Sequence, residues 1–141
     1  MLIRPFTRAE ETDVILLWEH CGLTRPWNNP DRDIQRKLST QSELFLVGEL
    51  DGRIIASAMA GYDGHRGSVF YLCVHHDFQH KGYGKQLMKE IERKLIGLGC
   101  PKLNILVRTD NDAVMRFYEK LGYQLDAVSS YGKRLITDEE A

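Results

Sequence analysis

The chain has 141 residues, of which 43% are hydrophobic and 28% charged, and this composition is typical of one globular domain spanning residues 1–141. Its formal net charge of −1 predicts no general attraction to nucleic acid or to an anionic membrane, so any anion site must be local. Because no apolar run is long enough for a signal peptide or a bilayer span, we expect a cytoplasmic protein without membrane partners.

The cysteines are three in number and widely spaced: Cys21, Cys73 and Cys100. An odd number without a C-x-x-C pair argues against a disulfide framework and against a structural zinc site. We expect three small buried thiols and no bound metal.

The first elements are a short strand, Leu2–Pro5, and a helix. Thr7 and Glu10 form a capping box at the start of this helix, an apolar stripe at helical spacing follows, and Gly22 is placed to end it.

Asn29 and Pro30 are a suitable N-cap and first residue for a second helix. Two strand patterns follow, Leu44–Leu50 and Arg53–Tyr62. Asp51-Gly52 between them predicts a tight hairpin.

A polar turn, Asp63–Gly67, leads to a strand over Ser68–Val74. After a glycine-bearing loop, apolar residues up to Leu98 predict a long helix closed by Gly99. Leu103–Val107 is almost wholly apolar and predicts a strand buried on both faces.

Asn111 opens a last helix, which Gly122 ends. Two strand-like pieces surround Tyr131-Gly132, and the acidic residues Asp138–Glu140 predict a frayed end. The order β-α-α-β-β-β-α-β-α-β-β predicts an α/β (α+β) fold with a mixed, partly antiparallel sheet covered by helices.

The segment Gln79–Gly84 carries the clearest chemical signal. Gly82 and Gly84 stand where the long helix begins, so backbone N–H groups and the positive end of the helix dipole can bind an anion. Lys81 and Lys85 add positive charge, and His80 belongs to the same segment. Taken alone, the two glycines have a tight turn as their alternative, and the segment matches neither a Walker loop nor a full dinucleotide fingerprint.

Gln79-x-x-Gly82-x-Gly84, preceded by Leu72-x-Val74, resembles the coenzyme A motif Q/R-x-x-G-x-G/A of the GNAT superfamily of N-acetyltransferases. Asn111 and the segment Phe117-Tyr118-Glu119-Lys120-Leu121-Gly122-Tyr123 resemble a second motif of this family. Val114 replaces its usual alanine, and Tyr123 its common phenylalanine.

The resemblance implies a mostly antiparallel sheet of six to seven strands with a splay, flanked by four helices. It also implies acetyl-CoA as co-substrate, an amine acceptor, direct attack in a ternary complex, and a monomer or homodimer. The residues implied to bind the coenzyme are Leu72, Cys73, Val74, Gln79, His80, Lys81, Gly82, Tyr83, Gly84, Lys85, Asn111 and Tyr118.

Tyr118 is implied to be the general acid for the leaving thiolate, the alternative being a core aromatic residue. A backbone N–H near Cys73 or Val74 is implied to hold the oxyanion. Because an amine with a pKa of about 10.4 is mostly charged at neutral pH, a base or a water chain must also remove a proton. Candidates for the base are Glu49, Asp63, His65 and His75.

Acceptor contacts are expected from the loop between the first two helices and from the turn after the Arg53–Tyr62 strand, since loops on a rigid scaffold commonly bind ligands. The candidates are Arg25, Trp27, Asn28, Tyr62, Asp63 and Arg66. The two arginines suit an anionic group on the acceptor, and Trp27 has packing against the sheet edge as its alternative.

Two further functions remain open from the sequence. The first is a non-catalytic acyl-CoA-binding module, because the strand Leu103–Val107 lacks the acid that many relatives of the family carry on a central strand. The second is a nucleotide-binding fold.

Overall fold

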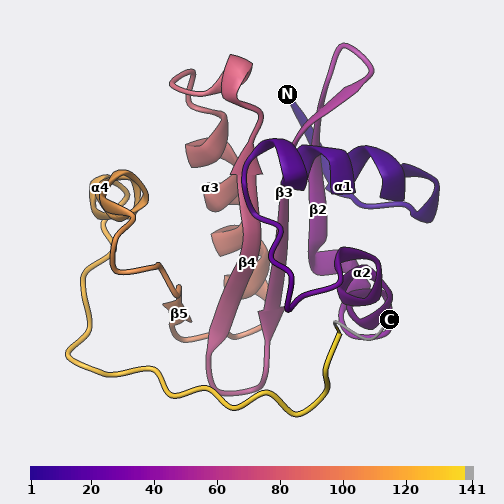
Figure 1. Ribbon diagram of the computed structural model, residues 1–141. Coiled ribbons are helices and arrows are strands. Elements are labelled where there is room, and N and C mark those ends of the chain that lie inside the picture. Colours follow the sequence, from indigo (N-terminus) through magenta and orange to yellow (C-terminus); the bar gives the residue numbers. More distant parts are fainter. Residues whose placement is uncertain (139–141) are drawn as a thin grey trace.

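A computed structural model describes residues 1–138, which form a single sheet with helices on both of its faces (Figure 1). The strands are β1 (Leu2–Pro5), β2 (Phe45–Leu50), β3 (Arg53–Tyr62), β4 (Gly67–Val74) and β5 (Leu103–Asn104). The α-helices are α1 (Glu11–His20), α2 (Pro30–Leu38), α3 (Tyr83–Gly97) and α4 (Asp112–Lys120). Short 3-10 turns cover Arg8–Glu10, Ser42–Leu44 and His76–Phe78.

The strands lie in the order β1-β2-β3-β4-β5, the first four antiparallel and β5 parallel to β4. The predicted hairpin between β2 and β3 is confirmed, since Asp51 and Gly52 both have positive φ angles, 51° and 76°. β5 pairs with β4 only at Gly67 and Ser68, so the two strands part almost at once.

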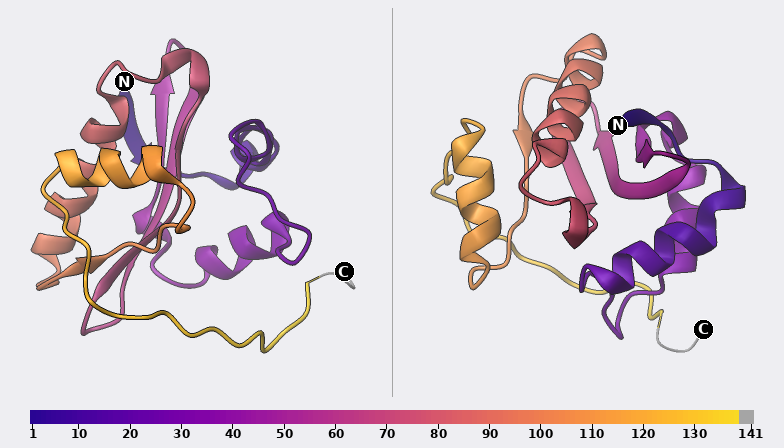
Figure 2. Two further views of the ribbon diagram at one scale, coloured as in Figure 1. Left: turned by 60° about the vertical axis from the view of Figure 1, so that its left-hand side comes forward. Right: turned by 90° about the horizontal axis from the view of Figure 1, so that it is seen from above.

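Helices cover both faces of the sheet (Figure 2), and an apolar core fills the layer on each side. Trp18 of α1 and Ile34 of α2 pack on one face against Phe45 of β2. Leu87 of α3 and Tyr118 of α4 belong to the core of the other face. A ligand beside β4 can therefore meet different helices on the two faces.

The predicted helix starts agree with the structure. The Thr7 N–H donates to the Glu10 carboxylate at 3.2 Å. The side chains of Asn29 and Asn111 each accept a hydrogen bond at 3.2 Å, from the N–H groups of Arg32 and Val114.

The predicted sheet of six to seven strands is wrong, because the described residues form five. The chain after α4, residues 124–138, is irregular rather than a pair of strands. It runs past the end of the sheet that carries the β3–β4 turn and reaches α2 (Figure 1). Leu125 and Tyr131 are 95% and 96% exposed, so no neighbouring strand covers these strand-forming residues.

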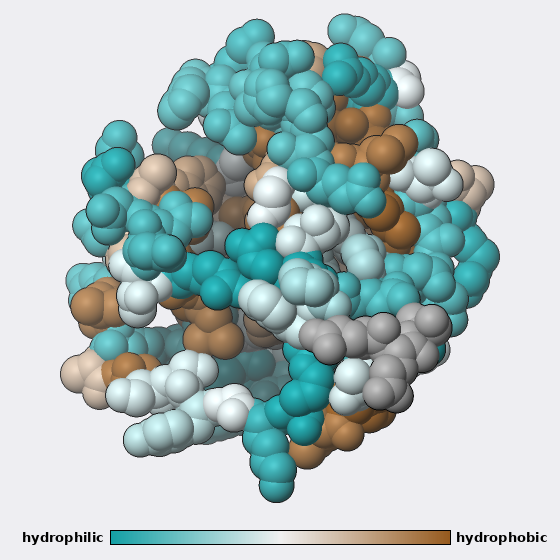
Figure 3. All heavy atoms as spheres, viewed as in Figure 1, coloured by the Kyte–Doolittle hydropathy of each residue, from teal (hydrophilic) through white to brown (hydrophobic). Residues whose placement is uncertain are grey.

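Figure 3 shows a mainly hydrophilic face on which apolar side chains form separate groups.

The strand predicted over Leu103–Val107 is shorter and less buried than expected. Only Leu103 and Asn104 pair, Ile105 and Val107 pack on the core, and Leu106 is 66% exposed. The core covers only one face of this segment, because the segment diverges from β4 and lies at the edge of the sheet.

The prediction of a frayed acidic end is wrong for Asp138, while Glu139 and Glu140 lie outside the described residues. The Asp138 side chain is 1% exposed. It accepts hydrogen bonds from Arg36 Nη2 at 2.7 Å, from Arg36 Nη1 at 3.2 Å and from the Asn29 N–H at 3.1 Å. Arg36 in the first place, and then Asn29, lower the pKa of the Asp138 carboxyl to about 2.

No helix among residues 1–138 is long and apolar enough to cross a membrane.

We expect Asp138→Asn to lower the melting temperature at pH 7 by a few degrees, because the ion pair with Arg36 is lost. A carboxyl whose pKa is lowered on folding stabilises the fold above its unfolded pKa, and this contribution is lost as the pH falls toward 2. The difference from wild type should therefore shrink below about pH 4 in thermal melts. Asp126→Asn, which breaks only the exposed pair with Lys102, is the control. Equal melting temperatures for the two variants at pH 7 would contradict the anchoring role of Asp138.

Candidate functional site

The segment Gln79–Gly84 connects β4 to α3 and has an unusual backbone. His80 and Gly82 adopt left-handed conformations, with φ of 63° and 86°, and Gly82 is the N-cap of α3. The Gln79 side-chain amide donates to the Val74 carbonyl at 2.9 Å, which holds the loop against the end of β4. Gln79 thus has a structural role that needs no ligand.

The N-terminus of α3 offers free donors. The first bond into the helix is from the Gln86 N–H to the Gly82 carbonyl, at 3.0 Å. The N–H groups of Gly82 to Lys85 have no acceptor in the described part of the chain. A Cβ at Gly82 would meet no atom within 4 Å, so open space lies beside these donors. The arrangement suits a phosphate group.

Gly84 serves packing more than ligand approach, which refines the sequence interpretation. A Cβ at this position would lie 3.1 Å from the Phe117 ring. The close contact of Gly84 with Phe117 fixes α4 against the first turn of α3. Tyr118, the next residue of α4, is thereby held near the same end of α3.

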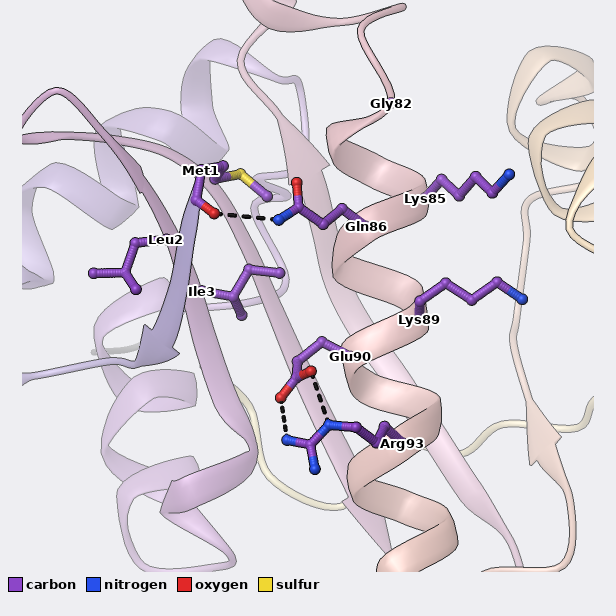
Figure 4. Close-up of a pocket in the computed structure, with 9 residues that line it drawn as sticks. All are labelled: Met1, Leu2, Ile3, Gly82, Lys85, Gln86, Lys89, Glu90 and Arg93. Carbon is purple, nitrogen blue, oxygen red and sulfur yellow. Dashed lines mark hydrogen bonds and ion pairs between the residues drawn. The ribbon is translucent and has the colours of Figure 1, made fainter.

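Positive side chains gather around this end of the molecule. Arg53 and Lys81 both lie over the Phe78 ring, at 5.5 and 5.7 Å from its centroid. Lys85 and Lys89 extend from α3 on the side away from β1 (Figure 4). The sequence interpretation included Lys81 and Lys85 but missed Arg53 and Lys89. Lys89 could have been found from its spacing of four residues from Lys85, whereas Arg53 lies on a distant hairpin.

A pocket of about 660 Å³ lies between α3 and β1, and Lys85 and Lys89 are among the residues that line it. Met1, Leu2 and Ile3 form one wall, and Gln86 bonds across it to the Met1 carbonyl at 3.2 Å (Figure 4). Tyr118 and β4 do not line it. Because Gly82 and Lys85 also line this pocket, it adjoins the loop that holds the free donors.

The edge of β4 that faces β5 is unpaired beyond Ser68 within the described residues. This stretch includes Leu72, Cys73 and Val74, the predicted ligand contacts on the strand. Leu72 and Val74 pack toward the α3 core, whereas Cys73 lies in the core of the α1 face. An extended ligand can take the place of a strand along such an edge.

Tyr118 is 7% exposed, and no hydrogen-bond partner of its hydroxyl occurs in residues 1–138. Burial raises its pKa to about 12, so the hydroxyl is protonated at neutral pH. The two roles considered for Tyr118, core aromatic residue and general acid, are compatible in the structure. Tyr118 is a core residue, and its hydroxyl also has a proton to donate. Asn111 caps α4, and its side-chain oxygen is used for that bond.

The predicted bases lie apart from Tyr118. Glu49 is on β2, two strands from β4, where it pairs with Arg4 at 3.4 Å. Asp63 and His65 lie in the β3–β4 turn, at the opposite end of β4 from the loop Gln79–Gly84 and the free donors of α3, together called the cradle below. The Asp63 carboxylate accepts the His65 N–H at 2.8 Å.

His75 lies next to the cradle, but both of its ring nitrogens are engaged. Nδ1 accepts the Asp77 N–H at 3.2 Å, and Nε2 is 3.2 Å from Arg53 Nη2. Its ring also stacks on those of His20 and His76, at 4.2 and 5.0 Å between centroids. Burial, followed by the charges of His20 and Arg53, lowers the pKa of His75 and favours a neutral ring.

The predicted acceptor residues divide into two groups. Tyr62 and Arg66 belong to the far β3–β4 turn with Asp63, where the Tyr62 hydroxyl donates to the carbonyls of Gly64 and Gly99 at 3.2 and 3.3 Å. That turn is at the opposite end of β4 from the free donors.

The second group lies in the loop between α1 and α2. Arg25 is folded onto its own loop, donating to the carbonyls of Gly22 and Thr24 at 2.7 and 2.9 Å. Trp27 is 40% exposed and has the Arg108 guanidinium 5.9 Å from its ring centroid. Asn28 accepts from Arg134 at 2.9 Å. This loop therefore meets the segment that follows β5.

Free amides at a helix start, beside a strand edge left open by its neighbour, suit an extended ligand that carries phosphate. Residues 12–123 match the model of the Acetyltransferase (GNAT) family, and the chain belongs to this family.

The chain is 56% identical over 140 residues to an acetyltransferase of Yersinia enterocolitica, with 99% of each protein covered. Its fold is similar to that of Ard1 from Thermoplasma volcanium, with a TM-score of 0.74 and 24% identity over 89% of this chain and 84% of the other. It is also similar to the ribosomal-protein-S18-alanine N-acetyltransferase of Escherichia coli, with a TM-score of 0.71 and 20% identity over 86% and 76%. At these identities the structural matches establish the fold alone.

We expect Gly82→Asp to weaken coenzyme A binding about tenfold more than Gly82→Asn, as measured by calorimetry. The two side chains have nearly the same shape and both tolerate the left-handed conformation, so the comparison isolates one negative charge beside the free amides. Equal affinities of the two folded variants for coenzyme A would contradict the assignment of a phosphate-binding site to this loop.

Proposed function

We propose that the protein transfers the acetyl group of acetyl-CoA to an amine of a small molecule or protein, by direct attack in a ternary complex. The observation that carries the proposal is the set of free N–H groups from Gly82 to Lys85 at the start of α3, close to the open edge of β4. Family membership supports acetyl transfer in general, and this geometry supports coenzyme A as the carrier.

The pyrophosphate would be held by the amides of this loop, with charge from Lys81, Lys85, Lys89 and Arg53. The linear arm would follow the unpaired edge of β4 past Val74 and Leu72. Donors fixed in place before the reaction stabilise a developing oxyanion without reorganisation, and an amide near Cys73 or Val74 is suited to this role.

Tyr118 would return a proton to the leaving thiolate. Its raised pKa keeps the hydroxyl protonated at neutral pH. A thiol has a pKa of about 8.5, so its thiolate is a good leaving group and needs only modest help from an acid.

We propose that water, rather than a side chain, removes the proton of the acceptor amine. Glu49 is paired with Arg4, His65 lies in the far turn, and both nitrogens of His75 are engaged. A water chain to solvent suffices where the fraction of neutral amine limits the rate.

The acceptor would enter beside the α1–α2 loop, where Trp27 and Arg108 meet. Asn28 lies in the same loop and faces Arg134. The proposed location of the reaction is the cytoplasm.

A non-catalytic acyl-CoA-binding module is the second candidate. It is favoured by one observation, that no predicted base lies beside Tyr118 with a free proton acceptor. Release of coenzyme A thiol should be measured with a panel of amines and peptides, and acetyl-CoA binding should be shown separately. Binding without turnover on any acceptor would favour the module.

We expect Tyr118→Phe to lower kcat about tenfold, a modest effect because the leaving thiolate is stable, and to leave coenzyme A affinity within about twofold. Tyr131→Phe is the matched control, since Tyr131 is 96% exposed. An unchanged kcat would assign Tyr118 to the core alone.

We expect kcat/KM for the acceptor to rise with pH until it reaches the pKa of the amine used, because no side chain serves as the base. With acceptor amines of different pKa, this rising part of the pH profile should shift by the same amount as the pKa of the amine. His75→Gln should leave its position unchanged. A limb fixed near pH 6.5 for every amine would instead indicate an imidazole base.

A further inference from the structure

The middle of β4 contains a bulge whose backbone is strained. Ser57 and Met59 of β3 pair with Cys73 and Phe70, so one β3 residue faces two residues of β4. One of these two is Tyr71, which has a φ of 54° although it is not a glycine. A bulky residue adopts this conformation only where its surroundings enforce it.

Three contacts enforce the conformation of Tyr71. Its ring stacks on that of Trp18, with 3.9 Å between the centroids. Its carbonyl accepts a hydrogen bond from Ser57 Oγ at 3.0 Å, and the Trp18 indole N–H donates to the same Oγ at 2.8 Å. Its hydroxyl donates to Asp33 Oδ2 at 2.6 Å. Burial, followed by the bond to Asp33, raises the pKa of Tyr71, so the hydroxyl stays protonated.

The Tyr71–Asp33 bond belongs to a longer chain of polar contacts. Arg36 donates to Asp33 at 3.2 Å and binds both oxygens of Asp138, at 2.7 and 3.2 Å. Asp33 and Arg36 lie on α2, and Asp138 lies at the end of the segment that crosses from α4. Helix α2 is therefore tied to the bulge on one side and to the C-terminal segment on the other.

Tyr71, the first residue of the bulge, precedes Leu72, Cys73 and Val74, which lie in the stretch of β4 whose outer edge is unpaired. A rotation at Tyr71 would change the direction of every N–H group in this stretch, because a bulge sets which way the following residues face. In acyl transfer, an amide that holds an oxyanion must keep its aim within a few tenths of an ångström.

We propose that Tyr71 and Asp33 are positioning residues for acyl transfer, holding the β4 bulge so that its following amides face the acyl carbonyl. The inference rests on the proposed function. Through Asp33, helix α2 would contribute to the reaction without contacting the ligand.

The test compares Tyr71→Phe, Asp33→Ala, the double variant and Asp33→Asn in the full chain. Tyr71→Phe keeps the ring on Trp18 and removes only the hydroxyl. We expect each of the first two to lower kcat about tenfold, with the KM for acetyl-CoA within about threefold, because aim is lost and binding surface is kept. The double variant should be no slower than the singles, since each single already removes the Tyr71–Asp33 bond. Asp33→Asn retains an oxygen acceptor and should recover most of kcat. Asp126→Asn is the matched control for loss of an acidic charge.

A second measurement does not depend on turnover. Amide chemical shifts of Leu72, Cys73 and Val74 should move in Tyr71→Phe, and their response to added coenzyme A should be smaller than in wild type. Unmoved shifts, or a loss of kcat that Asp33→Asn fails to restore, would overturn the positioning role. If wild type binds coenzyme A but acetylates no acceptor, the proposed function fails, and the amide shifts still decide whether Tyr71 holds the bulge.

Discussion

Backbone pairing between β4 and β5 stops after Gly67 and Ser68, and the proposed coenzyme site depends on this early divergence of the two strands. A continuous ladder would satisfy the outer amides of β4 and leave no edge for an extended ligand. Because β5 diverges, the described residues from Val69 to Val74 keep an unpaired edge that leads toward the start of α3. The parting also leaves Leu106 exposed and shortens β5 to two residues.

The start of α3 is held from both sides of the open edge. Gln79 bonds the preceding loop to the end of β4, and Gly84 lets Phe117 approach closely enough to fix α4. On the other face of the sheet, Tyr71 joins β4 to α2 through Asp33. The strand that borders the site is thus braced by both helical layers, while the amides at the end of α3 stay free for a ligand.

Local order could be predicted from the sequence because it depends on near neighbours. Asn29 and Asn111 cap their helices through bonds three residues away, and Asp51-Gly52 forms its turn through its own backbone angles. The strands predicted after α4 are wrong because strand formation, unlike a cap or a tight turn, does not depend on near neighbours alone. Strand propensity at Leu125 or Tyr131 has no effect without a neighbouring edge, and such an edge is a property of the whole fold.

The sequence alone determined the family motifs, the prediction of an anion site at Gln79–Gly84 and the order of the elements up to α4. Only the tertiary structure decided that Gly84 serves helix packing, that Asp138 is buried against Arg36, and that Arg53 and Lys89 lie with the cradle lysines. It also separated His65 from the cradle by the length of β4 and occupied both nitrogens of His75. Motifs record local backbone geometry, whereas these outcomes depend on contacts between residues far apart in the chain, which the packing of the layers sets.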